Sequence, residues 1–362
     1  MPNTGFVKKM KKNSPIPTIG PHRIGRGKRC FLIAEAGVNH NGSPHRAMRL
    51  VKEAARAGAD AIKFQTFKTT RLTTKSARTA FYQRDGTGGE MSQAKMLKKL
   101  ELPLTSYRSI LSECQRQGIL FLSTPFDESS ADFLDDLGIC AFKISSGDLT
   151  NLPFLSYVAK KKKPMILSTG MATLAEVRAG VHAVRMTGNK NLVLLHCVSA
   201  YPTEPKDVNL MAMETLRKTF HVPVGFSDHT KGIVVSLSAV ALGATILEKH
   251  FTLDRALTGP DQKISIIPDE LRALSKGIGD IHLAMGDGVK KPVIAEKETA
   301  GMSRRSLVAK RDLVKGEVLN HLSVDILRPG TGLSPDWLPK LIGRRVNRNV
   351  DSGSLLRLEW FR

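Results

Sequence analysis

The stretch VGFSDHTKGIVVSLSAVALGATILEKHFT, residues 224–252, carries the pattern that decides the fold. An apolar run ends in polar residues at 224–230, a helix-like segment follows at 233–242, and a second apolar run ends in polar residues at 245–252. A strand, a helix and a strand in this order give parallel pairing, because the crossover returns the chain to the same edge of the sheet. The stretch therefore predicts a β–α–β unit.

The same unit recurs along most of the chain. Six further apolar runs that end in polar residues precede the quoted stretch, at 31–37, 61–67, 120–126, 141–147, 165–170 and 192–198. Helical patterns lie between the runs, for instance at 45–57, 106–117 and 174–186. Eight strands in about 260 residues favour an α/β fold that closes into a (β/α)8 TIM barrel. An open doubly wound sheet is the alternative, but the sequence after the first strand lacks its Gly-rich dinucleotide motif.

Two segments flank the predicted barrel, which takes residues 30–289. Residues 1–29 form a basic N-terminal arm with eight Lys and Arg residues and no acidic ones. After a polar linker at 290–303, residues 304–362 change to short β-like runs separated by turns, so we expect a small, mostly β domain there. About 60 residues is near the lower limit for an independent core, so this domain is expected to pack on something else.

Composition and charge exclude several classes of protein. The 362 residues carry a net charge of +22, from 55 Lys and Arg against 33 Asp and Glu. This excess is spread along the chain rather than gathered in one stripe with aromatic residues, so we expect a basic solvated surface and no nucleic acid partner. No apolar run approaches the ~20 residues of a membrane span, and no signal peptide is evident. Four cysteines without paired spacing are typical of a reduced, cytoplasmic protein.

Polar side chains gather at the carboxyl ends of the predicted strands, where TIM barrels place their active sites. A single polar residue at a strand end is often incidental. Polar residues at the ends of eight successive strands indicate a binding site instead, because charges within apolar runs are costly unless paired or liganded. These residues are Glu35, Lys63, Gln65, Thr124, Lys143, Ser146, Ser168, His196, Ser227, His229, Glu248 and His250.

Two histidines form the first candidate group. His229 and His250 lie at matching depths on the seventh and eighth strands, which are neighbours in a barrel. Two imidazoles in this arrangement can hold one divalent ion and leave positions open for substrate. Nitrogen ligands favour Mn²⁺, Co²⁺ or Zn²⁺ over Mg²⁺. The spacing alone fits a hydrogen-bonded histidine pair without metal equally well.

Two lysines form the second group. Lys63 and Lys143 both interrupt apolar strands. Two ammonium groups surrounded by serine and threonine hydroxyls suit the phosphate and the carboxylate of one small ligand. Two alternatives stay open, namely ion-paired structural lysines and a Schiff-base lysine of an aldolase or lyase.

Short motifs in chain order give more specific information. They are AEAGVNHNG (34–42), IKFQTF (62–67), STPF (123–126), FKISSGD (142–148), LSTGM (167–171), LHCVSAYPT (195–203), GFSDHT (225–230), LEKHFTLD (247–254) and GPD (259–261). Together they resemble the sialic acid synthase family, and the tail SLVAKRDLVKGEVL with LRPGTG resembles its C-terminal SAF, or antifreeze-like, domain. The resemblance runs from about residue 18 to the end of the chain.

This resemblance implies a nonulosonic (sialic) acid synthase, a transferase that forms a C–C bond. It would condense phosphoenolpyruvate with N-acetylmannosamine or a related N-acetylated amino sugar and release phosphate by C–O cleavage. The metal, Mn²⁺ by preference with Mg²⁺ or Co²⁺ as alternatives, would be bound by His229 and His250. The residues that the resemblance assigns to phosphoenolpyruvate are Lys63, Lys143, Thr124, Ser146, Ser168 and Ser227. Those that hold the sugar or manage protons are Glu35, Gln65, Tyr201, Asp148 and Asp261, with Glu35 and Asp148 counted as catalytic alongside the histidines.

The resemblance also implies a partner subunit. Arg328 matches an arginine that reaches from the SAF domain of one subunit into the barrel of the other, as in a domain-swapped homodimer. The acceptor sugar stays open, because Gln262 and Ile264 replace the family's usual residues in a sugar-facing region. N-acetylmannosamine, its 6-phosphate and precursors of legionaminic or pseudaminic acid are the alternatives. The alternative from another class is a non-catalytic carbohydrate- or polyanion-binding protein.

Overall fold

A computed structural model describes residues 17–79 and 92–362, so part of the predicted basic arm lies outside the described residues. The chain divides into two compact units, of which the first ends at Gly286 and the second spans Asp287–Arg362. Each unit is described by itself below. Among the helices in the described ranges, none is long and apolar enough to cross a membrane.

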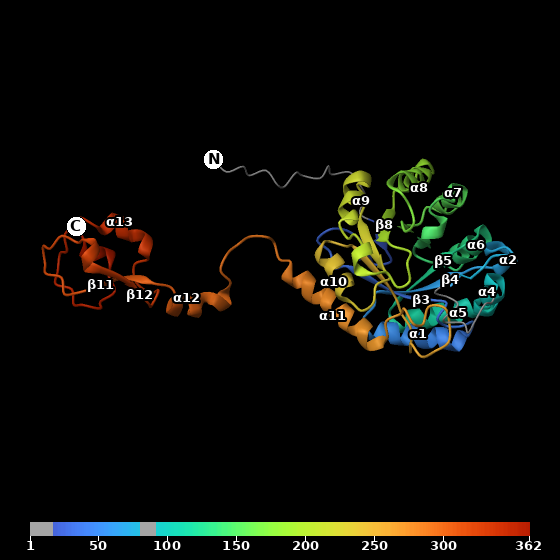
Figure 1. Ribbon diagram of the computed structural model, residues 1–362, viewed down its shortest axis with the longest axis horizontal. Coiled ribbons are helices and arrows are strands. Elements are labelled where there is room, and N and C mark those ends of the chain that lie inside the picture. The colour runs from blue at the N-terminus through green and yellow to red at the C-terminus, as the bar shows by residue number, and fades with distance from the viewer. Residues whose placement is uncertain (1–16, 80–91) are drawn as a thin grey trace. The chain divides into compact units, whose positions relative to one another are not determined.

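The first unit is a parallel barrel, which confirms the predicted TIM-barrel fold (Figure 1). Its hydrogen-bonded strand order is β5-β4-β3-β10-β9-β8-β7-β6, and the two outer members of this order, β5 and β6, contact each other. The strands are β3 (Phe31–Gly37), β4 (Ala61–Thr66), β5 (Leu120–Pro125), β6 (Phe142–Ile144), β7 (Met165–Ser168), β8 (Leu192–Cys197), β9 (Val224–Asp228) and β10 (Ile246–His250).

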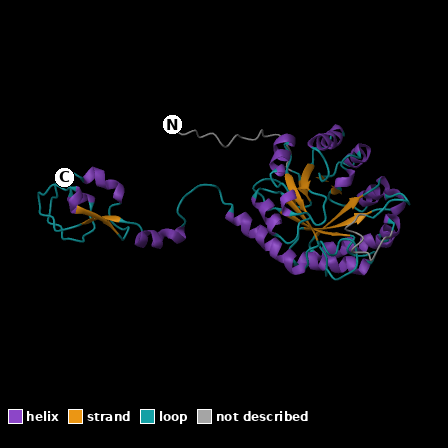
Figure 2. Cartoon of the chain, in the orientation of Figure 1, coloured by secondary structure: helices purple, strands orange, loops and turns teal. Residues whose placement is uncertain are grey.

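Helices lie outside this ring of strands, as Figure 2 shows. They are α1 (Pro44–Arg56), α2 (Thr69–Leu72), α4 (Gln93–Leu100), α5 (Tyr107–Gln117), α6 (Glu128–Asp136), α7 (Leu152–Ala159), α8 (Leu174–Met186), α9 (Ala212–Phe220), α10 (Val234–Ala241) and α11 (Pro268–Ala284). Local sequence fixes several of their ends. A capping box of Thr173 and Glu176 begins α8, and Gly118 ends α5 with a φ of 69° that favours glycine.

The inside of the barrel is divided into an apolar floor and a polar layer above it. The floor consists of inward-facing strand residues and of Ala141, which directly precedes β6. The strand residues are Phe31, Ile33, Ala61, Leu122, Ile166, Val193, Leu195 and Ile246. A hairpin of β1 (Thr18–Ile19) and β2 (His22–Arg23) adds buried Ile19 and Ile24 to this floor. Because side chains alternate along a strand, the next inward positions lie one step nearer the carboxyl ends, and these positions are mostly polar.

One glycine is required by this packing. Gly225 lies on β9 at an inward position, between the floor and the polar layer. A Cβ atom there would collide with the carbonyl oxygen of Ile246 and come within 2.7 Å of a Leu195 methyl group. Only glycine lets β9 and β10 approach this closely, and both strands carry residues of the site described below.

The second unit, Asp287–Arg362, has its own hydrophobic core. It contains α12 (Lys297–Ser303), α13 (Leu338–Leu341) and an antiparallel pair, β11 (Ser306–Ala309) with β12 (Val324–Leu327). Further single bridges, such as Leu313 with Val350, tie the turns to this pair. The unit is therefore the small, mostly β domain that the sequence predicts. Its core residues include Leu307, Leu313, Leu319, Leu341, Val346 and Leu356.

Candidate active site

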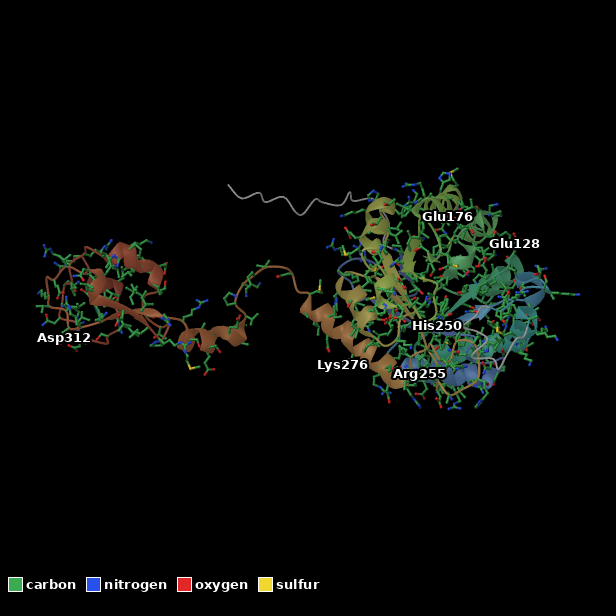
Figure 3. The ribbon with its side chains drawn as sticks, viewed as in Figure 1. Glu128, Glu176, His250, Arg255, Lys276 and Asp312 are labelled. Atoms are coloured by element: carbon green, nitrogen blue, oxygen red, sulfur yellow. The ribbon has the colours of Figure 1, made fainter. Side chains whose placement is uncertain are left out.

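Most of the predicted site residues line one cavity of about 520 Å³ at the carboxyl ends of the strands. Figure 3 marks the position of His250 among them, inside the ring of helices. Of the fourteen predicted residues, all but Asp148 and Arg328 line this cavity. The twelve are Glu35, Lys63, Gln65, Thr124, Lys143, Ser146, Ser168, Tyr201, Ser227, His229, His250 and Asp261.

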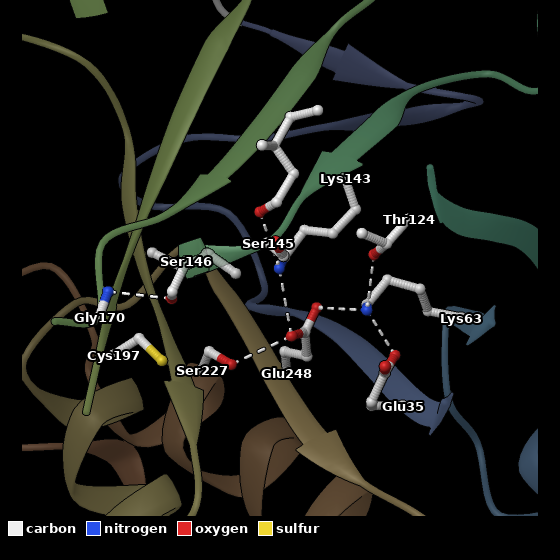
Figure 4. Close-up of polar contacts among 12 residues, drawn as sticks. Glu35, Lys63, Thr124, Lys143, Ser145, Ser146, Gly170, Cys197, Ser227 and Glu248 are labelled. Atoms are coloured by element: carbon white, nitrogen blue, oxygen red, sulfur yellow. Dashed lines mark hydrogen bonds and ion pairs between the residues drawn. The ribbon is translucent and has the colours of Figure 1, made fainter. Parts of the chain in front are cut away.

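Lys63 is held by three inward-facing partners (Figure 4). Its Nζ lies 2.6 Å from Oε2 of Glu35 and donates a hydrogen bond of 3.1 Å to Oγ1 of Thr124. A third contact, of 3.8 Å, joins Nζ to Oε2 of Glu248. The Lys63 side chain is only 3% exposed, so this ammonium is buried among two carboxylates and a hydroxyl.

Lys143 reaches the same carboxylate from the other side. Its Nζ lies 3.4 Å from Oε1 of Glu248, which also accepts a hydrogen bond of 3.0 Å from Oγ of Ser227. The Nζ group donates a further bond of 3.3 Å to the backbone carbonyl of Ile144. Glu248 therefore links both lysines, and the two ammonium groups with Glu35 and Glu248 form a balanced group of two positive and two negative charges.

The carboxylates in this group differ in their proton affinity. Burial raises the pKa of Glu35 to about 7, although the neighbouring Lys63 opposes the change. Burial also acts on Glu248, but Lys143 and Lys63 together lower its pKa to about 2. Glu248 therefore stays ionised near neutral pH, while Glu35 is able to gain or lose a proton there, as proton-transfer groups in active sites do.

Serine hydroxyls surround Lys143 on the β6 to β8 side of the cavity. Oγ of Ser146 accepts a hydrogen bond of 3.0 Å from the backbone N–H of Gly170. Oγ of Ser168 is buried and has no hydrogen-bond partner within the part of the chain that the structure describes. A buried hydroxyl without a partner costs free energy, so its presence in the same cavity as Lys143 indicates a place for a ligand oxygen.

The two histidines lie together at the edge of this group. The ring centroids of His229 and His250 are 5.4 Å apart, and the Tyr201 ring lies 4.2 Å from that of His229. Nδ1 of His229 donates a hydrogen bond of 2.7 Å to the carbonyl of Val198, which leaves a lone pair on Nε2 of the neutral ring.

The residues present fit a metal that is held by two protein ligands. Nδ1 of His250 is buried and has no hydrogen-bond partner in the described ranges. Within those ranges, no group of three or more His, Cys, Asp or Glu side chains is placed to bind a metal ion. A divalent ion held by His229 and His250 would therefore take its remaining ligands from water or substrate, as open catalytic sites do.

Asp261 and Gln65 complete the wall near Glu35. Burial raises the pKa of Asp261 to about 6. Nε2 of Gln65 donates a long hydrogen bond of 3.5 Å to Oε1 of Glu35. Both side chains line the cavity above the lysines, where the sequence predicts contacts with the sugar.

The remaining two predicted residues lie elsewhere. Asp148 ends a single helical turn after β6, and its carboxylate accepts a hydrogen bond of 2.6 Å from Oγ of Ser145, which itself lines the cavity. Arg328 belongs to the second unit, where its Nε donates to the carbonyl of Ser303 at 3.1 Å. Asp148 therefore contacts the cavity through Ser145, and Arg328 is not part of the barrel.

The structure also adds residues to the site and removes one strand-end candidate. Glu248 has the central position in the charged group, although the sequence identified it only as a polar strand-end residue. His196 faces away from the cavity, where it stacks on Phe226 and its Nε2 donates to the carbonyl of Val208. Apolar residues from α2, α4 and neighbouring loops form one wall of the cavity: Val38, Leu72, Met96, Leu97, Leu100 and Phe126.

Comparison with known proteins supports the resemblance seen in the motifs. The model of the NeuB family matches residues 50–290, and the model of the SAF domain matches residues 304–361. An N,N'-diacetyllegionaminic acid synthase of Legionella pneumophila is 45% identical over 354 residues, which cover 97% of this chain and 99% of the relative. An N-acetylneuraminate-9-phosphate synthase of Homo sapiens is 34% identical over 343 residues, covering 93% of this chain and 94% of the relative.

A solved structure extends this likeness to three dimensions. The N-acetylneuraminic acid (sialic acid) synthetase of Leptospira borgpetersenii, crystallised with citrate, is 36% identical and superposes with a TM-score of 0.71. The superposition covers 79% of this chain and 95% of that one. Both predictions from the motifs, the barrel family and the SAF domain, are confirmed by the family models. The chain therefore belongs to the NeuB family, with a C-terminal SAF domain, and is a synthase of the nonulosonic acid type.

Proposed function

We propose that this enzyme condenses phosphoenolpyruvate with an N-acetylated amino sugar and releases inorganic phosphate. One observation carries the proposal: two buried lysines lie in the same cavity as a pair of histidines and the Ser168 hydroxyl, which has no hydrogen-bond partner among the described residues. The lysine end suits a small, highly charged anion, and the histidine end suits a metal that activates a carbonyl group.

The lysines account for binding of phosphoenolpyruvate. Its phosphate and carboxylate would lie on Lys63 and Lys143, with hydroxyls from Thr124, Ser146, Ser168 and Ser227 completing their hydrogen bonds. Glu248 lies 3.4 Å from one ammonium and 3.8 Å from the other, and contacts of this length can give way to stronger ones with a charged ligand. Burial lowers the pKa of Lys143, and Glu248 opposes this change while it holds both lysines in place.

The chemistry follows from the electron-rich enol carbon of the ligand. C3 of phosphoenolpyruvate attacks the aldehyde carbon of the open-chain sugar, the aldehyde oxygen takes up a proton, and positive charge develops at C2. Water adds to C2 and loses a proton, for which Glu35, with a pKa of about 7, is a suitable acceptor. The resulting hemiketal phosphate collapses to the ketone with cleavage of the C–O bond, and inorganic phosphate leaves.

The proposed cofactor is a divalent metal held by His229 and His250, with Mn²⁺ preferred and Mg²⁺ or Co²⁺ as alternatives. When bound, such an ion supplies a Lewis acid that polarises the sugar aldehyde. The hydrogen bond from His229 to Val198 orients one ring for this purpose. Removal of metal by a chelator is expected to abolish phosphate release, and added Mn²⁺ is expected to restore it.

The apolar wall favours one class of acceptor. Met96, Leu97 and Leu100 of α4, with Leu72 of α2, offer contacts for methyl groups rather than for hydroxyls or a phosphate. A di-N-acetylated deoxy hexose presents such methyl groups, as the diacetyl product named for the Legionella relative requires. We therefore place this sugar ahead of N-acetylmannosamine and its 6-phosphate as the acceptor.

One assay tests the function. Phosphate release is measured with phosphoenolpyruvate and Mn²⁺ against these three sugars and the precursor of pseudaminic acid. The expected result is release that depends on all components and has its highest kcat/KM with the diacetylated sugar. Label in the bridging oxygen of phosphoenolpyruvate should leave with the phosphate, as C–O cleavage demands. A covalent adduct with pyruvate after borohydride treatment would instead support the Schiff-base aldolase.

A domain-swapped homodimer is the proposed assembly, in which Arg328 of one subunit reaches the barrel of its partner. The exposed position of Arg328 in the second unit leaves it available for this contact. Mixing inactive Lys143→Met and Arg328→Ala subunits by co-refolding tests the arrangement. Only an exchange of domains gives mixed dimers with one intact site, so about a quarter of the wild-type activity should return. No return of activity would mean that Arg328 acts within its own subunit, and an active Arg328→Ala protein would mean that Arg328 has no role.

A further inference from the structure

A second charged pair lies directly behind the two histidines. Asp228 is the last residue of β9 and directly precedes His229, and Lys249 precedes His250 on β10. Because neighbouring residues of a strand face opposite sides, Asp228 and Lys249 face outward while the histidines face the cavity. Asp228 and Lys249 are opposite each other in the register of the two strands, and their side chains are 0% and 1% exposed.

The contacts of Lys249 reach both sides of His229. Its Nζ lies 2.8 Å from Oδ2 of Asp228, the residue before His229. The same Nζ donates a hydrogen bond of 2.6 Å to the carbonyl of Thr230, the residue after His229. One ammonium group on the chain neighbour of His250 therefore fixes the backbone on both sides of His229.

The carboxylate of Asp228 strengthens this clamp. Its Oδ1 accepts a hydrogen bond of 2.8 Å from the backbone N–H of Thr230, and its Oδ2 accepts one from the hydroxyl of Ser236 on α10. Both carboxylate oxygens are thus occupied, and the turn at the end of β9 is tied to the helix behind it. The backbone that carries His229 cannot shift relative to β10 unless these bonds break.

The geometry of a metal site makes such a clamp consequential. Imidazole nitrogens bind divalent ions at about 2.0 to 2.2 Å, and misplacement by about half an ångström lowers affinity. With only two protein ligands in the proposed site, the separation of His229 and His250 has no third ligand to correct it. We propose that the Asp228–Lys249 pair positions the two histidines and thereby sets the affinity of the metal site, an inference that rests on the metal proposed above.

The competing explanation is an ion pair that stabilises the fold and nothing more. Removing one member of a buried pair leaves an uncompensated charge, whereas replacing both members with uncharged residues is often tolerated. Lys249→Met and Asp228→Asn alone are therefore expected to lower the unfolding temperature, and the double variant Asp228→Asn/Lys249→Met is expected to recover most of it. A structural role predicts that metal affinity recovers with stability. A positioning role predicts that it does not, because the carbonyl of Thr230 has still lost its donor.

The test measures Mn²⁺ binding directly, apart from any activity. Full-length protein is stripped with a chelator, and free Mn²⁺ is followed by electron paramagnetic resonance while unfolding temperature is recorded in parallel. The folded double variant is expected to bind Mn²⁺ about 10- to 100-fold more weakly than the wild type, the range seen for partners of metal ligands. The matched control is Lys161→Met, which removes an ion pair of 2.7 Å with Asp132 and should leave Mn²⁺ affinity unchanged.

The outcomes separate the two proposals. A double variant that binds Mn²⁺ like the wild type would overturn the positioning role and leave the metal site standing. Wild-type protein that binds Mn²⁺ no better than His229→Ala would overturn the metal site, and the positioning role with it. Should the single variants fail to fold, the double variant alone decides, since it carries no unpaired charge.

Discussion

The strands β9 and β10 carry charged residues on both faces, and the two faces are built differently. Behind the barrel wall, Asp228 and Lys249 are 2.8 Å apart, and further donors fill both carboxylate oxygens. Inside the barrel, Glu248 is shared between two lysines at 3.4 and 3.8 Å. The inward group also includes a neighbouring serine hydroxyl, Ser168, that has no partner in the described ranges.

Burial alone does not distinguish structural charges from functional ones. Both groups are almost inaccessible to solvent, yet the outward pair is saturated with partners and the inward group is not. A saturated buried pair resists any change of partner, because each broken bond leaves a desolvated charge. Within the inward group, Glu35 holds Lys63 at 2.6 Å, but the contacts of Lys143 with Glu248 and with the carbonyl of Ile144 are longer, at 3.4 and 3.3 Å. An anionic ligand can replace these longer contacts, which is what a binding site needs.

The largest expected effect comes from removing an inward charge. We expect Lys143→Met to lower kcat/KM for phosphoenolpyruvate by about 1,000-fold. Removing the buried cationic partner of a bound anion costs about 4 kcal/mol of binding free energy. Phosphate release at saturating sugar measures the effect, with Lys161→Met on the outer surface as the control. A loss of less than about tenfold would break the assignment of the inward group to this ligand.

A smaller effect is expected below the polar layer. Ile166 lies in the apolar floor on β7, two residues before Ser168. Ile166→Ala should lower the free energy of unfolding by about 3 kcal/mol through the cavity it leaves, and Ile166→Val by about 1 kcal/mol. Urea unfolding followed by circular dichroism is the suitable measurement, because both tryptophans, Trp337 and Trp360, lie in the second unit. A large change in KM for phosphoenolpyruvate with either variant would show that a substitution in the floor also disturbs the polar layer.

A buried histidine outside the charged group predicts a pH effect. His40 is fully buried, its Nδ1 accepts a hydrogen bond of 3.0 Å from the N–H of Gly42, and burial with nearby Arg46 lowers its pKa from 6.5 to about 3. Below pH 6.5 the unfolded chain takes up a proton on His40 that the folded chain does not. The contribution of neutral His40 to the free energy of unfolding is therefore present above pH 6.5 and is lost as pH falls toward 3. Between pH 7 and 5 the loss should be about 2 kcal/mol.

The substitution that checks this effect is His40→Asn, whose side-chain oxygen can still accept from Gly42. Unfolding by urea is measured at pH 7 and at pH 5 for both proteins. The variant should lose less stability than the wild type over this interval, because its side chain does not titrate. Equal losses for the two proteins would mean that His40 is not the group responsible.

The smallest effect is expected at the outer surface. Lys276 and Asp280 on α11 form an ion pair of 2.9 Å, but their side chains are 77% and 63% exposed. Lys276→Met should change the free energy of unfolding by less than about 0.5 kcal/mol, because water screens such pairs. Urea unfolding measures this change. A loss of stability comparable to that of Ile166→Ala would contradict the expectation that exposed ion pairs contribute less than buried residues.

The sequence predicted the strands because each one has the same apolar pattern with a polar end. Predicted strands ran past the observed ends: 141–147 became β6 (Phe142–Ile144), after which the chain turns and Asp148 bonds to Ser145. A polar residue near a strand end can belong to the strand or to the loop that follows it. Once the strand ends, side chains no longer alternate between its two faces, so the pattern cannot place them.

Two features of the site show where sequence reasoning reached its limit. Alternation could have excluded His196, since Leu195 faces the floor and the next residue must face outward. The role of Glu248 could not be read in this way. Its contacts with Lys63 on β4 and Lys143 on β6 cross the interior of the barrel, so they depend on barrel closure and strand tilt rather than on local sequence.

The hairpin that places Ile19 and Ile24 in the floor closes the amino-terminal end of the barrel to ligands. With the amino-terminal end filled by these side chains, the cavity lies at the carboxyl ends of the strands, and ligands enter from that side. The deep lysines must then be reached before the sugar covers them. For the reaction proposed above, this arrangement predicts an ordered exchange, in which the small anion binds before the sugar and phosphate leaves after the sugar acid.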